Sequence, residues 1–364
     1  MARAFGGPNK YIQRAGEIDR LSGYLEPLGK RVLALIDRAL FDQLSERIDR
    51  GRSPGLDIRF ERFGGECCTS EIERVRKIAL EHGSEVLLGI GGGKTADTAK
   101  IVAVDIGARI VIAPTIASTD APCSAIAVRY SEHGIYEESL RLPRNPDAVV
   151  VDSALVAAAP ARFLVAGIGD ALSTWFEARS NIESRTDNYV AGGFPAPEAG
   201  MAIARHCQTV LMRDALQARI AVEAGLLTQA VENIIEANTL LSGLGFENCG
   251  CSAAHGIHDG LTVLAEVHGH FHGEKVAFGT LCLLMLENRE RSEIETMIRF
   301  YRSIGLPTTL ADLGIVEDVP AKIGQVAEAA CRPGNIIYAT PVDITVPAVR
   351  DAILALDAFS RSIR

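Results

Sequence analysis

The segment Glu85-Val-Leu-Leu-Gly-Ile-Gly-Gly-Gly-Lys-Thr95 decides the fold that the sequence predicts. It starts as a short apolar run, passes through a glycine cluster and opens into a helical pattern over 95–104. Glycines at such a junction let the backbone approach a phosphate, and a helix N-terminus presents free N–H groups and a partial positive charge. The segment therefore predicts a buried strand, a pyrophosphate-binding turn and a helix.

Neither of two named phosphate-binding motifs matches the glycine cluster. A Walker A loop requires a glycine where Leu88 stands. The dinucleotide motif G-x-G-x-x-G fails at Lys94 when it is counted from Gly89. Counted from Gly91, it ends at Ala96, which fits only the looser variant. A plain glycine turn is therefore the alternative to a phosphate site.

The first half of the chain alternates short apolar runs with helical patterns. Strands alternating with helices predict a mostly parallel sheet that is covered by helices on both faces. The expected strands are 31–36, 85–88, 108–113 and 147–151, and the helices between them include 70–82 and 95–104.

The second half shows apolar residues at helical spacing and almost no strand pattern. The expected helices are 170–180, 197–212, 215–241, 254–264 and 275–287. A chain of 364 residues suits two domains. The prediction is an α/β nucleotide-binding domain over 1–160 and an all-α domain over 161–364.

Composition and charge exclude several classes of function. The net charge of −9 argues against binding to nucleic acid or to an anionic membrane surface, since both require clustered Lys and Arg. The sequence has no long uncharged apolar run and no secretion signal at its start. Without such a signal, the eight cysteines are expected to be reduced thiols. We expect a cytoplasmic protein.

Polar side chains follow two of the predicted strands. Asp37 ends the first strand, where a carboxylate would bind ribose hydroxyls and repel a 2′-phosphate, which favours NAD over NADP. Helix capping explains Asp37 equally well. The loop 114–124 is rich in small hydroxyl residues and contains Asp120, which suits a polyol or the nicotinamide ribose. An ordinary Asp- and Ser-rich turn is the alternative.

Histidines cluster in the second half of the sequence. His255 and His258 stand three apart, which places them on one helical face, and His268-Gly-His-Phe-His272 follows. Such a cluster suggests a divalent metal site, although the spacing alone does not select the ligands. Asp170 stands at an expected glycine-to-helix junction, where it is a candidate third ligand or an N-cap. Cys249 and Cys251 are weaker candidates as soft ligands.

Taken together, these motifs resemble the glycerol dehydrogenases of the iron-containing (group III) alcohol dehydrogenase superfamily. The similarity runs from Lys10 to Lys322. Two departures bear on substrate preference: Asp259 stands where the family usually has Asn, and the stretch after Ser180 differs. The motifs that carry the resemblance are Gly89-Ile-Gly-Gly-Gly-Lys-Thr95 with Asp97, Pro114-Thr-Ile-Ala-Ser-Thr-Asp-Ala-Pro-Cys-Ser124, Gly167-Ile-Gly-Asp-Ala-Leu-Ser-Thr-Trp-Phe-Glu-Ala-Arg179 and His272-Gly-Glu-Lys-Val-Ala-Phe-Gly-Thr280.

The resemblance implies a dehydroquinate synthase-like fold with the active site between an α/β and a helical domain. It implies a metal, Zn²⁺ or Fe²⁺, on Asp170, His255 and His272, and contact of Asp120 with glycerol. It also implies a homo-oligomer, commonly an octamer. The implied NAD contacts are Asp37, Gly92, Gly93, Lys94, Thr95, Asp97, Thr115, Ser118, Ser124, Ile126 and Tyr130.

The implied reaction is the reversible, NAD-dependent oxidation of glycerol to dihydroxyacetone, by hydride transfer from a metal-stabilised alkoxide. His258 is expected to relay a proton to water. The alternatives are a dehydrogenase of another small vicinal diol, a glycerol-1-phosphate dehydrogenase, a dehydroquinate synthase-like enzyme, and a metal-stabilised binding protein without turnover. A glycerol-1-phosphate dehydrogenase would need basic residues in the loop that here carries Asp120 and Cys123.

Overall fold

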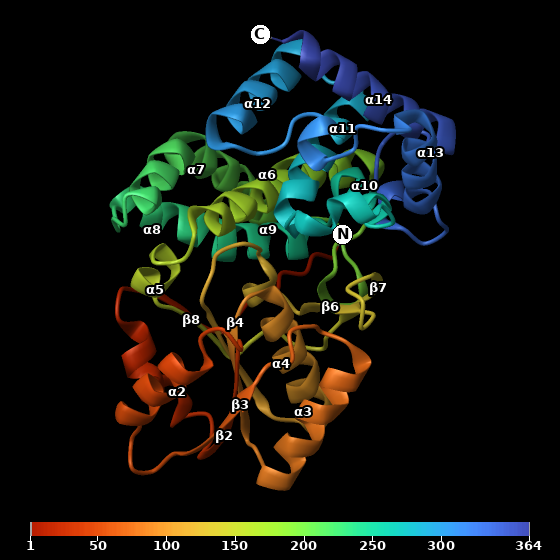
Figure 1. The fold of residues 1–364 in the computed structure, drawn as a ribbon. Coiled ribbons are helices and arrows are strands. Elements are labelled where there is room, and N and C mark those ends of the chain that lie inside the picture. Colours follow the sequence, from red (N-terminus) through yellow and green to blue (C-terminus); the bar gives the residue numbers. More distant parts are fainter. Residues whose placement is uncertain (1, 364) are drawn as a thin grey trace.

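A parallel sheet organises the first half of the computed structural model, which describes residues 2–363. Its six strands have the order β1-β8-β5-β4-β2-β3, and each neighbouring pair is parallel. A separate antiparallel hairpin, β6–β7, lies above one end of the sheet (Figure 1). The strands are β1 (Tyr11–Gln13), β2 (Arg31–Ile36), β3 (Asp57–Arg62), β4 (Val86–Gly91), β5 (Arg109–Pro114), β6 (Ile126–Tyr130), β7 (Tyr136–Arg141) and β8 (Ala148–Val151).

Alternating side chains bury both faces of the sheet. In β2, Val32 and Ile36 belong to one apolar cluster, and Leu33 and Leu35 to the other. Helices cover both faces, so the central strands are almost wholly apolar, as parallel sheets require. The helices of this half are α1 (Leu21–Leu25), α2 (Phe41–Arg50), α3 (Thr69–His82), α4 (Gly93–Ile106) and α5 (Ser153–Ala157).

The predicted mostly parallel sheet is confirmed, and the four expected strands appear as β2, β4, β5 and β8 with shifts of a few residues at most. The remaining strands were missed. β3 is an edge strand that carries charged residues, including Arg59 and Glu61, so it lacks the apolar run of a buried strand. β1 has only three residues.

Helices build the second half of the chain (Figure 1). They pack around one extended apolar cluster. The long helix α6 packs against α7, α9 and α11. It begins at Ala161, directly after residue 160, where the sequence predicts the boundary between two domains. That boundary stays a proposal. The helices are α6 (Ala161–Ser184), α7 (Glu198–Glu223), α8 (Gln229–Glu236), α9 (Ser242–Cys249), α10 (Ala253–Leu261), α11 (His272–Leu286), α12 (Arg291–Ile304), α13 (Val319–Ala330) and α14 (Val346–Ser362).

The expected helix over 215–241 is wrong as a single element. α7 continues through 215 and ends at Glu223, and a turn with Gly225 at φ +71° separates it from α8. A π-helical turn over Ala237–Leu241 then joins α8 to α9. Such turns are frequent at functional sites. Here the turn includes Asn238, whose side-chain amide donates to the carbonyl oxygens of Ala117 and Leu164.

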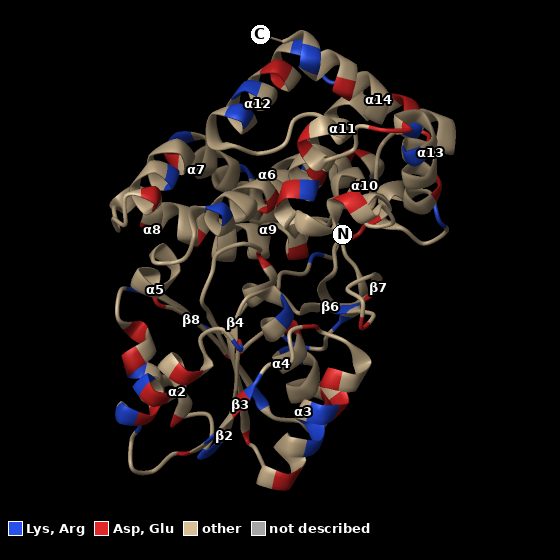
Figure 2. Ribbon diagram, in the orientation of Figure 1, with Lys and Arg blue, Asp and Glu red and all other residues tan. Residues whose placement is uncertain are grey.

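Hydropathy and charge along the helices complete the description of the fold. Within residues 2–363, no helix is both long and apolar enough to cross a bilayer. Lys and Arg are interspersed with Asp and Glu on the helices of both halves (Figure 2).

Candidate active site between the two halves

The glycine cluster lies at the point where the strand order reverses. β3 extends the sheet on one side of β2, and β4 extends it on the other. Ligands of open parallel sheets bind at such switch points, beyond the carboxyl ends of the strands. Asp37 follows β2 there, and its N–H donates to the carbonyl of Ile90 in β4. The glycines that follow β4 lead directly into α4.

Side chains at the three glycines would be crowded, most of all at Gly91. A Cβ on Gly91 would lie 2.5 Å from the hydroxyl of Thr95. On Gly92 it would lie 3.0 Å from Ile116, and on Gly93 3.0 Å from the hydroxyl of Thr119. The cluster is therefore more than a plain turn: it keeps the start of α4 close to the loop that follows β5. Gly92 and Gly93 at the start of α4 are partly exposed, and the first N–H groups of a helix, which lack partners within it, are the groups that a phosphate cradle uses.

Three expected cofactor contacts lie in or near this crevice, though with different surroundings. Lys94 is exposed, and its Nζ lies 2.5 Å from Glu66 Oε2. Thr95 is buried. Asp97 is buried as well, and it accepts from the N–H of Val128 and pairs with Lys100 at 2.9 Å. Asp97 therefore holds β6 in place, and a direct contact of Asp97 with NAD stays a prediction.

The loop after β5 and the hairpin beside it supply the other expected cofactor contacts. Thr115 and Ser118 are buried in the loop, and the N–H of Thr115 donates to the carbonyl of Gly91. Ile126 and Tyr130 mark the two ends of β6 and are partly exposed. Ser124, another expected contact, is buried and bonds locally, through its hydroxyl, to the backbone of Ile126 in β6.

Asp37 also makes a local turn. Its Oδ1 accepts from the N–H of Ala39 at 2.9 Å, whereas α2 begins only at Phe41 and has no side-chain cap. The N-cap interpretation of Asp37 is therefore wrong. The turn uses only Oδ1, and Asp37 is partly exposed. Its Oδ2 is therefore available to bind a ribose hydroxyl.

Asp170, His255 and His272 converge from three helices. Asp170 Oδ1 lies 3.2 Å from His272 Nε2 and 3.6 Å from His255 Nε2. Ligands of a tetrahedral zinc ion at its usual bond lengths are about 3.4 Å apart. Asp170 Oδ1 is buried and accepts no hydrogen bond. Three donors at this spacing, with one orphaned carboxylate oxygen among them, fit a divalent metal ion.

Electrostatics at the cluster favour a cation. Burial would raise the pKa of Asp170, but the neighbouring His272 and His255 outweigh it and hold that pKa well below its ordinary value. A carboxylate that is ionised in such a buried position requires a partner of opposite sign. A metal ion would supply that partner without protonated histidines.

Small residues bring these ligands together. A Cβ on Gly169 would lie 2.5 Å from the carbonyl oxygen of Gly273, and a Cβ on Gly273 would lie 1.8 Å from that of Ala166. Helices α6 and α11 therefore touch through their backbones, next to Asp170 and His272. The expected glycine-to-helix junction at Asp170 is wrong: α6 begins nine residues earlier, and the glycines serve close helix packing.

A buried carboxylate orients His255. Glu177 Oε2 lies 2.7 Å from His255 Nδ1, and Oε1 accepts from the N–H groups of Ser252 and His255. Cys251 lies near the same pair, and its thiol could complete a second metal-binding trio with Glu177 and His255. Because Glu177 is already committed to three donors, the Asp170 cluster is the better candidate for a metal site.

His258 does not take the position expected for a proton relay to water. It is 4% exposed, and its Nε2 and Nδ1 lie 3.0 Å from His272 Nδ1 and 3.1 Å from Asp259 Oδ1. Burial, reinforced by His272, lowers its pKa well below the ordinary value. His258 therefore supports His272 from behind, and we correct its expected role to that of a positioning residue.

Asp120 lies beside the metal cluster. Its N–H donates to Asp170 Oδ2 at 3.3 Å, and its own Oδ2 accepts from the hydroxyl of Ser242 at 2.6 Å. Burial, and then the charge of Asp170, raise the pKa of Asp120 well above the ordinary value. The loop after β5 thus joins the glycine crevice to the metal cluster, with one carboxyl group between them.

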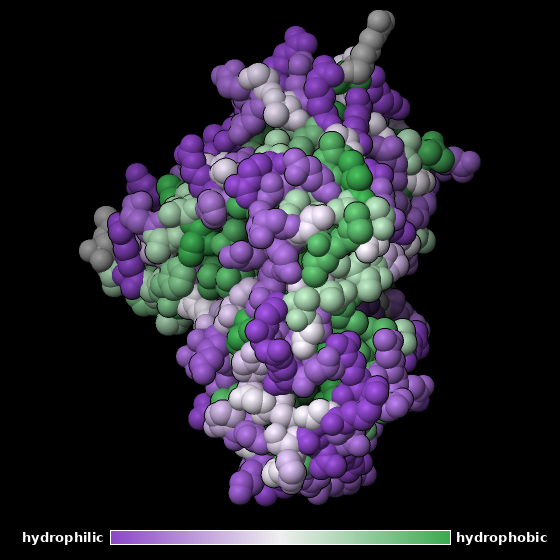
Figure 3. Space-filling view, turned by 90° about the vertical axis from the view of Figure 1, so that its left-hand side faces the viewer, coloured by the Kyte–Doolittle hydropathy of each residue, from purple (hydrophilic) through white to green (hydrophobic). Residues whose placement is uncertain are grey.

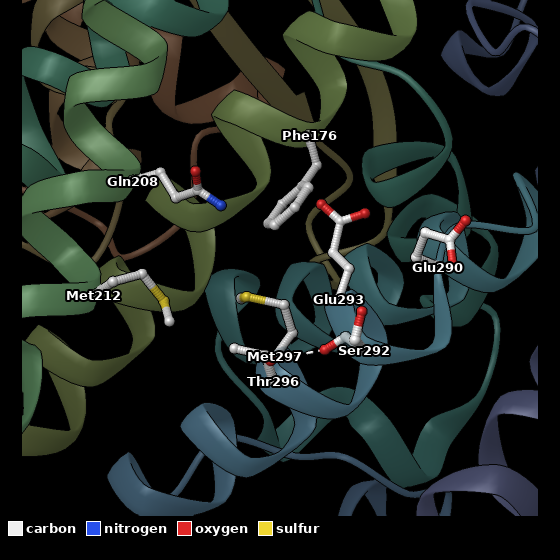
Figure 4. A pocket seen from close by; sticks show the side chains of 8 residues that line it. All are labelled: Phe176, Gln208, Met212, Glu290, Ser292, Glu293, Thr296 and Met297. Atoms are coloured by element: carbon white, nitrogen blue, oxygen red, sulfur yellow. Dashed lines mark hydrogen bonds between the residues drawn. The ribbon is translucent and has the colours of Figure 1, made fainter.

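A groove elsewhere is unrelated to this cluster. It lies between α7 and α12, and its lining side chains include neither Asp120 nor any of the three candidate metal ligands (Figure 4). The lining residues are Phe176, Gln208, Met212, Glu290, Ser292, Glu293, Thr296 and Met297.

Comparison with known proteins assigns the family. The model of the iron-containing alcohol dehydrogenases matches residues 8–153. A glycerol dehydrogenase of Pseudomonas putida is 46% identical to this chain, with 98% of each chain covered. The chain belongs to the iron-containing alcohol dehydrogenase family. The crystal structure of a probable glycerol dehydrogenase from Sinorhizobium meliloti 1021 is 88% identical, covers 100% of both chains and superposes with a TM-score of 0.97.

Another relative carries a different name. A glycolaldehyde reductase of Halobacterium salinarum is 43% identical to this chain, with 100% of each chain covered. Membership of the family and the recognition of glycerol dehydrogenase-like features in the sequence are thus confirmed. The fold is confirmed with them.

Sequence reasoning missed three residues that shape the site. Glu177 follows Asp170 by two helical turns, so a search along one helical face would have found it. Ser242 lies more than a hundred residues from Asp120, and no local pattern marks it. Asn335 reaches Asp259 from the C-terminal region, where the sequence shows no motif.

Proposed function

We propose that this chain oxidises glycerol to dihydroxyacetone, reversibly, with NAD and a divalent metal ion. The observation that carries the proposal is the convergence of Asp170, His255 and His272 beside Asp120. The glycine crevice lies across the same loop, so an alcohol at the cluster and a dinucleotide at the crevice could meet. The relatives named glycerol dehydrogenase support the choice of substrate.

The residues of the chain divide the work. Asp170, His255 and His272 would hold the ion, and the hydroxyl-rich loop with the glycine cluster would hold NAD. When bound, the metal lowers the pKa of an alcohol, and NAD accepts a hydride. Asp120 would accept a hydrogen bond from a second substrate hydroxyl, which fixes the carbon that faces the cofactor. Ser242 keeps the Asp120 carboxyl in place.

The finer assignments belong to the proposal as well. Asp37 at the end of β2 favours NAD over NADP, because a carboxylate there repels a 2′-phosphate. One carboxylate and two imidazoles suit Zn²⁺, with Fe²⁺ as the alternative. The site-residue assignments that follow from the family resemblance are retained, with His258 moved to a supporting role.

Reduction of glycolaldehyde is the second candidate activity, because a relative of similar identity carries that name. Both activities would use the same metal cluster and the same cofactor. They differ in the number of substrate hydroxyls that Asp120 can bind. A phosphorylated substrate is disfavoured, since the loop that contains Asp120 has no Lys or Arg between residues 114 and 124.

The test is NADH formation, followed by absorbance, from glycerol with the zinc-loaded protein. A chelator-treated sample and the variant His272→Ala serve as controls, and glycolaldehyde with NADH runs in parallel. We expect turnover with glycerol that is lost in both controls. Turnover with glycolaldehyde alone would transfer the proposal to the second candidate, and no reaction with any small alcohol or aldehyde would refute the dehydrogenase assignment.

We also propose that the chain forms a homo-oligomer, an octamer by family resemblance. Apolar surface gathers on the helical half of one face (Figure 3). Four exposed apolar residues lie in or just after the end of α7, namely Leu216, Ile220, Leu226 and Leu227. Light scattering on the native protein and on Ile220→Glu tests this proposal, which fails if the native protein is a monomer.

A further inference from the structure

A chain of four side chains runs from the metal cluster to the C-terminal region. His272 Nδ1 lies 3.0 Å from His258 Nε2, and His258 Nδ1 lies 3.1 Å from Asp259 Oδ1. The second oxygen of Asp259 accepts from the side-chain amide of Asn335 at 3.1 Å. Asn335 and Asp259 are 76 residues apart in the sequence, so the contact is a feature of the fold.

We propose that Asp259, fixed by Asn335, is a positioning residue that selects the tautomer of His272 through His258. This inference rests on the proposed metal site, because it concerns which nitrogen of His272 is free to bind an ion. Asp259 does not reach the ion or the substrate. Its effect is transmitted through two imidazole rings.

The inference follows from counting protons. A neutral imidazole has one N–H and one lone pair, and a metal ligand must present the lone pair. His272 directs Nε2 to the cluster, so its proton must be on Nδ1, where it is donated to His258 Nε2. His258 must then carry its own proton on Nδ1. Asp259 is the acceptor that this arrangement requires.

The reverse arrangement of the protons fails at both His272 and Asp259. If His258 Nε2 were the donor, His272 would carry its proton on Nε2 and could not bind a metal through that atom. His258 Nδ1 would then direct a lone pair at Asp259, whose carboxylate only accepts. A carboxylate at position 259 therefore removes the tautomer that cannot bind the ion.

The last of the four side chains, Asn335, is held rigidly, as a positioning role requires. Asn335 Oδ1 accepts from the N–H of Ile337 at 2.9 Å, so its amide group is held in one orientation that leaves Nδ2 for Asp259. A Cβ on Gly256 would lie 2.5 Å from Ile337 Cβ, so α10 packs directly against this segment.

The two histidines thus receive the same kind of support in different ways. Glu177 accepts directly from His255 Nδ1, whereas Asp259 acts on His272 through His258. Loss of such supporting partners typically lowers metal affinity by about 10- to 100-fold. We expect a loss of this size for Asp259→Ala, and a smaller loss for Asp259→Asn, whose amide oxygen still accepts from His258.

The experiment measures zinc affinity by competition with a chromophoric chelator, together with the visible spectrum of the Co²⁺-substituted protein. The variants are Asp259→Ala, Asp259→Asn and His258→Phe. The exposed acid Glu328 on α13, changed to Ala, is the matched control. Thermal melting of the metal-free proteins shows whether each variant folds, and His258→Phe tests the same chain should Asp259→Ala fail to fold.

The inference predicts weaker zinc binding and an altered Co²⁺ spectrum for Asp259→Ala and His258→Phe, partial rescue in Asp259→Asn, and native behaviour of Glu328→Ala. Native zinc affinity in folded Asp259→Ala and His258→Phe would overturn the inference. The proposed function would still stand in that case if the native protein binds one zinc ion per chain and the variant His272→Ala does not bind it. A native protein that binds no zinc would overturn both.

Discussion

The substitution Gly273→Ala tests how the metal ligands are brought together. Helices α6 and α11 meet through their backbones, and a Cβ at position 273 would lie 1.8 Å from the carbonyl oxygen of Ala166. Close carbon–oxygen contacts are about 3.3 Å, so the helices would have to part by about 1.5 Å. His272 directly precedes Gly273 on α11, and Asp170 lies one helical turn beyond Ala166 on α6, so the separation of these two ligands would grow by a similar amount.

The expected cost can be stated from this geometry. Overpacking costs up to about 3 kcal/mol, and the better helix propensity of Ala returns about 1 kcal/mol, so the net loss of stability is about 2 kcal/mol. A rise of about 1.5 Å in the ligand spacing exceeds what zinc ligands tolerate, and zinc affinity should fall by at least about 10-fold.

Denaturant unfolding of the metal-free protein and chelator competition measure the two effects separately. The matched control is Gly324→Ala on α13, where a Cβ would meet no atom within 4 Å. That variant should be more stable than the native protein, by up to about 1 kcal/mol, with native zinc affinity. A Gly273→Ala protein with native stability and native zinc affinity would refute the argument that backbone contact sets the site.

Three further outcomes are expected. Ser242→Ala removes the 2.6 Å bond to Asp120 and should lower kcat/KM for glycerol by about 10-fold, measured as NADH formation; an unchanged value would remove Ser242 from the site. In the native protein a thiol reagent should modify Cys331 first, because the other seven cysteines are buried, whereas the unfolded chain should yield all eight; rapid reaction of several native thiols would contradict this burial. Burial would raise the pKa of Glu274, but the hydrogen bonds from Arg162 outweigh this effect, and the pKa is lowered. Its stabilising effect is therefore present above the unfolded pKa and is lost as pH falls through the lowered folded pKa, and Arg162→Gln should flatten this acid limb of stability.

Local patterns predicted those parts of the molecule that depend on local structure. The apolar run and glycines at 85–95 gave the central strand and the crevice, because both are encoded within one short segment. The histidine cluster pointed to a metal site for the same reason. His255 and His258 are on one helix, as their spacing predicted.

Features that depend on packing between distant segments were not predictable. The glycines at 167 and 169 predict a glycine-to-helix junction before Asp170, since glycine in a sequence marks an irregular segment more often than a contact between helices. In the structure they lie inside α6, where side chains would collide with Ala117 and Gly273. The partner of Asp120 on α9 and the contact of Asn335 with α10 likewise exist only after the chain has folded.

The most direct test of the account follows one hydrogen atom. Glycerol labelled with deuterium on its central carbon is incubated with the zinc-loaded protein and NAD, and the mass of the reduced cofactor is measured. The account predicts that the deuterium appears in NADH and that dihydroxyacetone is the product, because Asp120 and the metal ligands present that carbon to the crevice. Unlabelled NADH, or no NADH from glycerol under any metal loading, would contradict it.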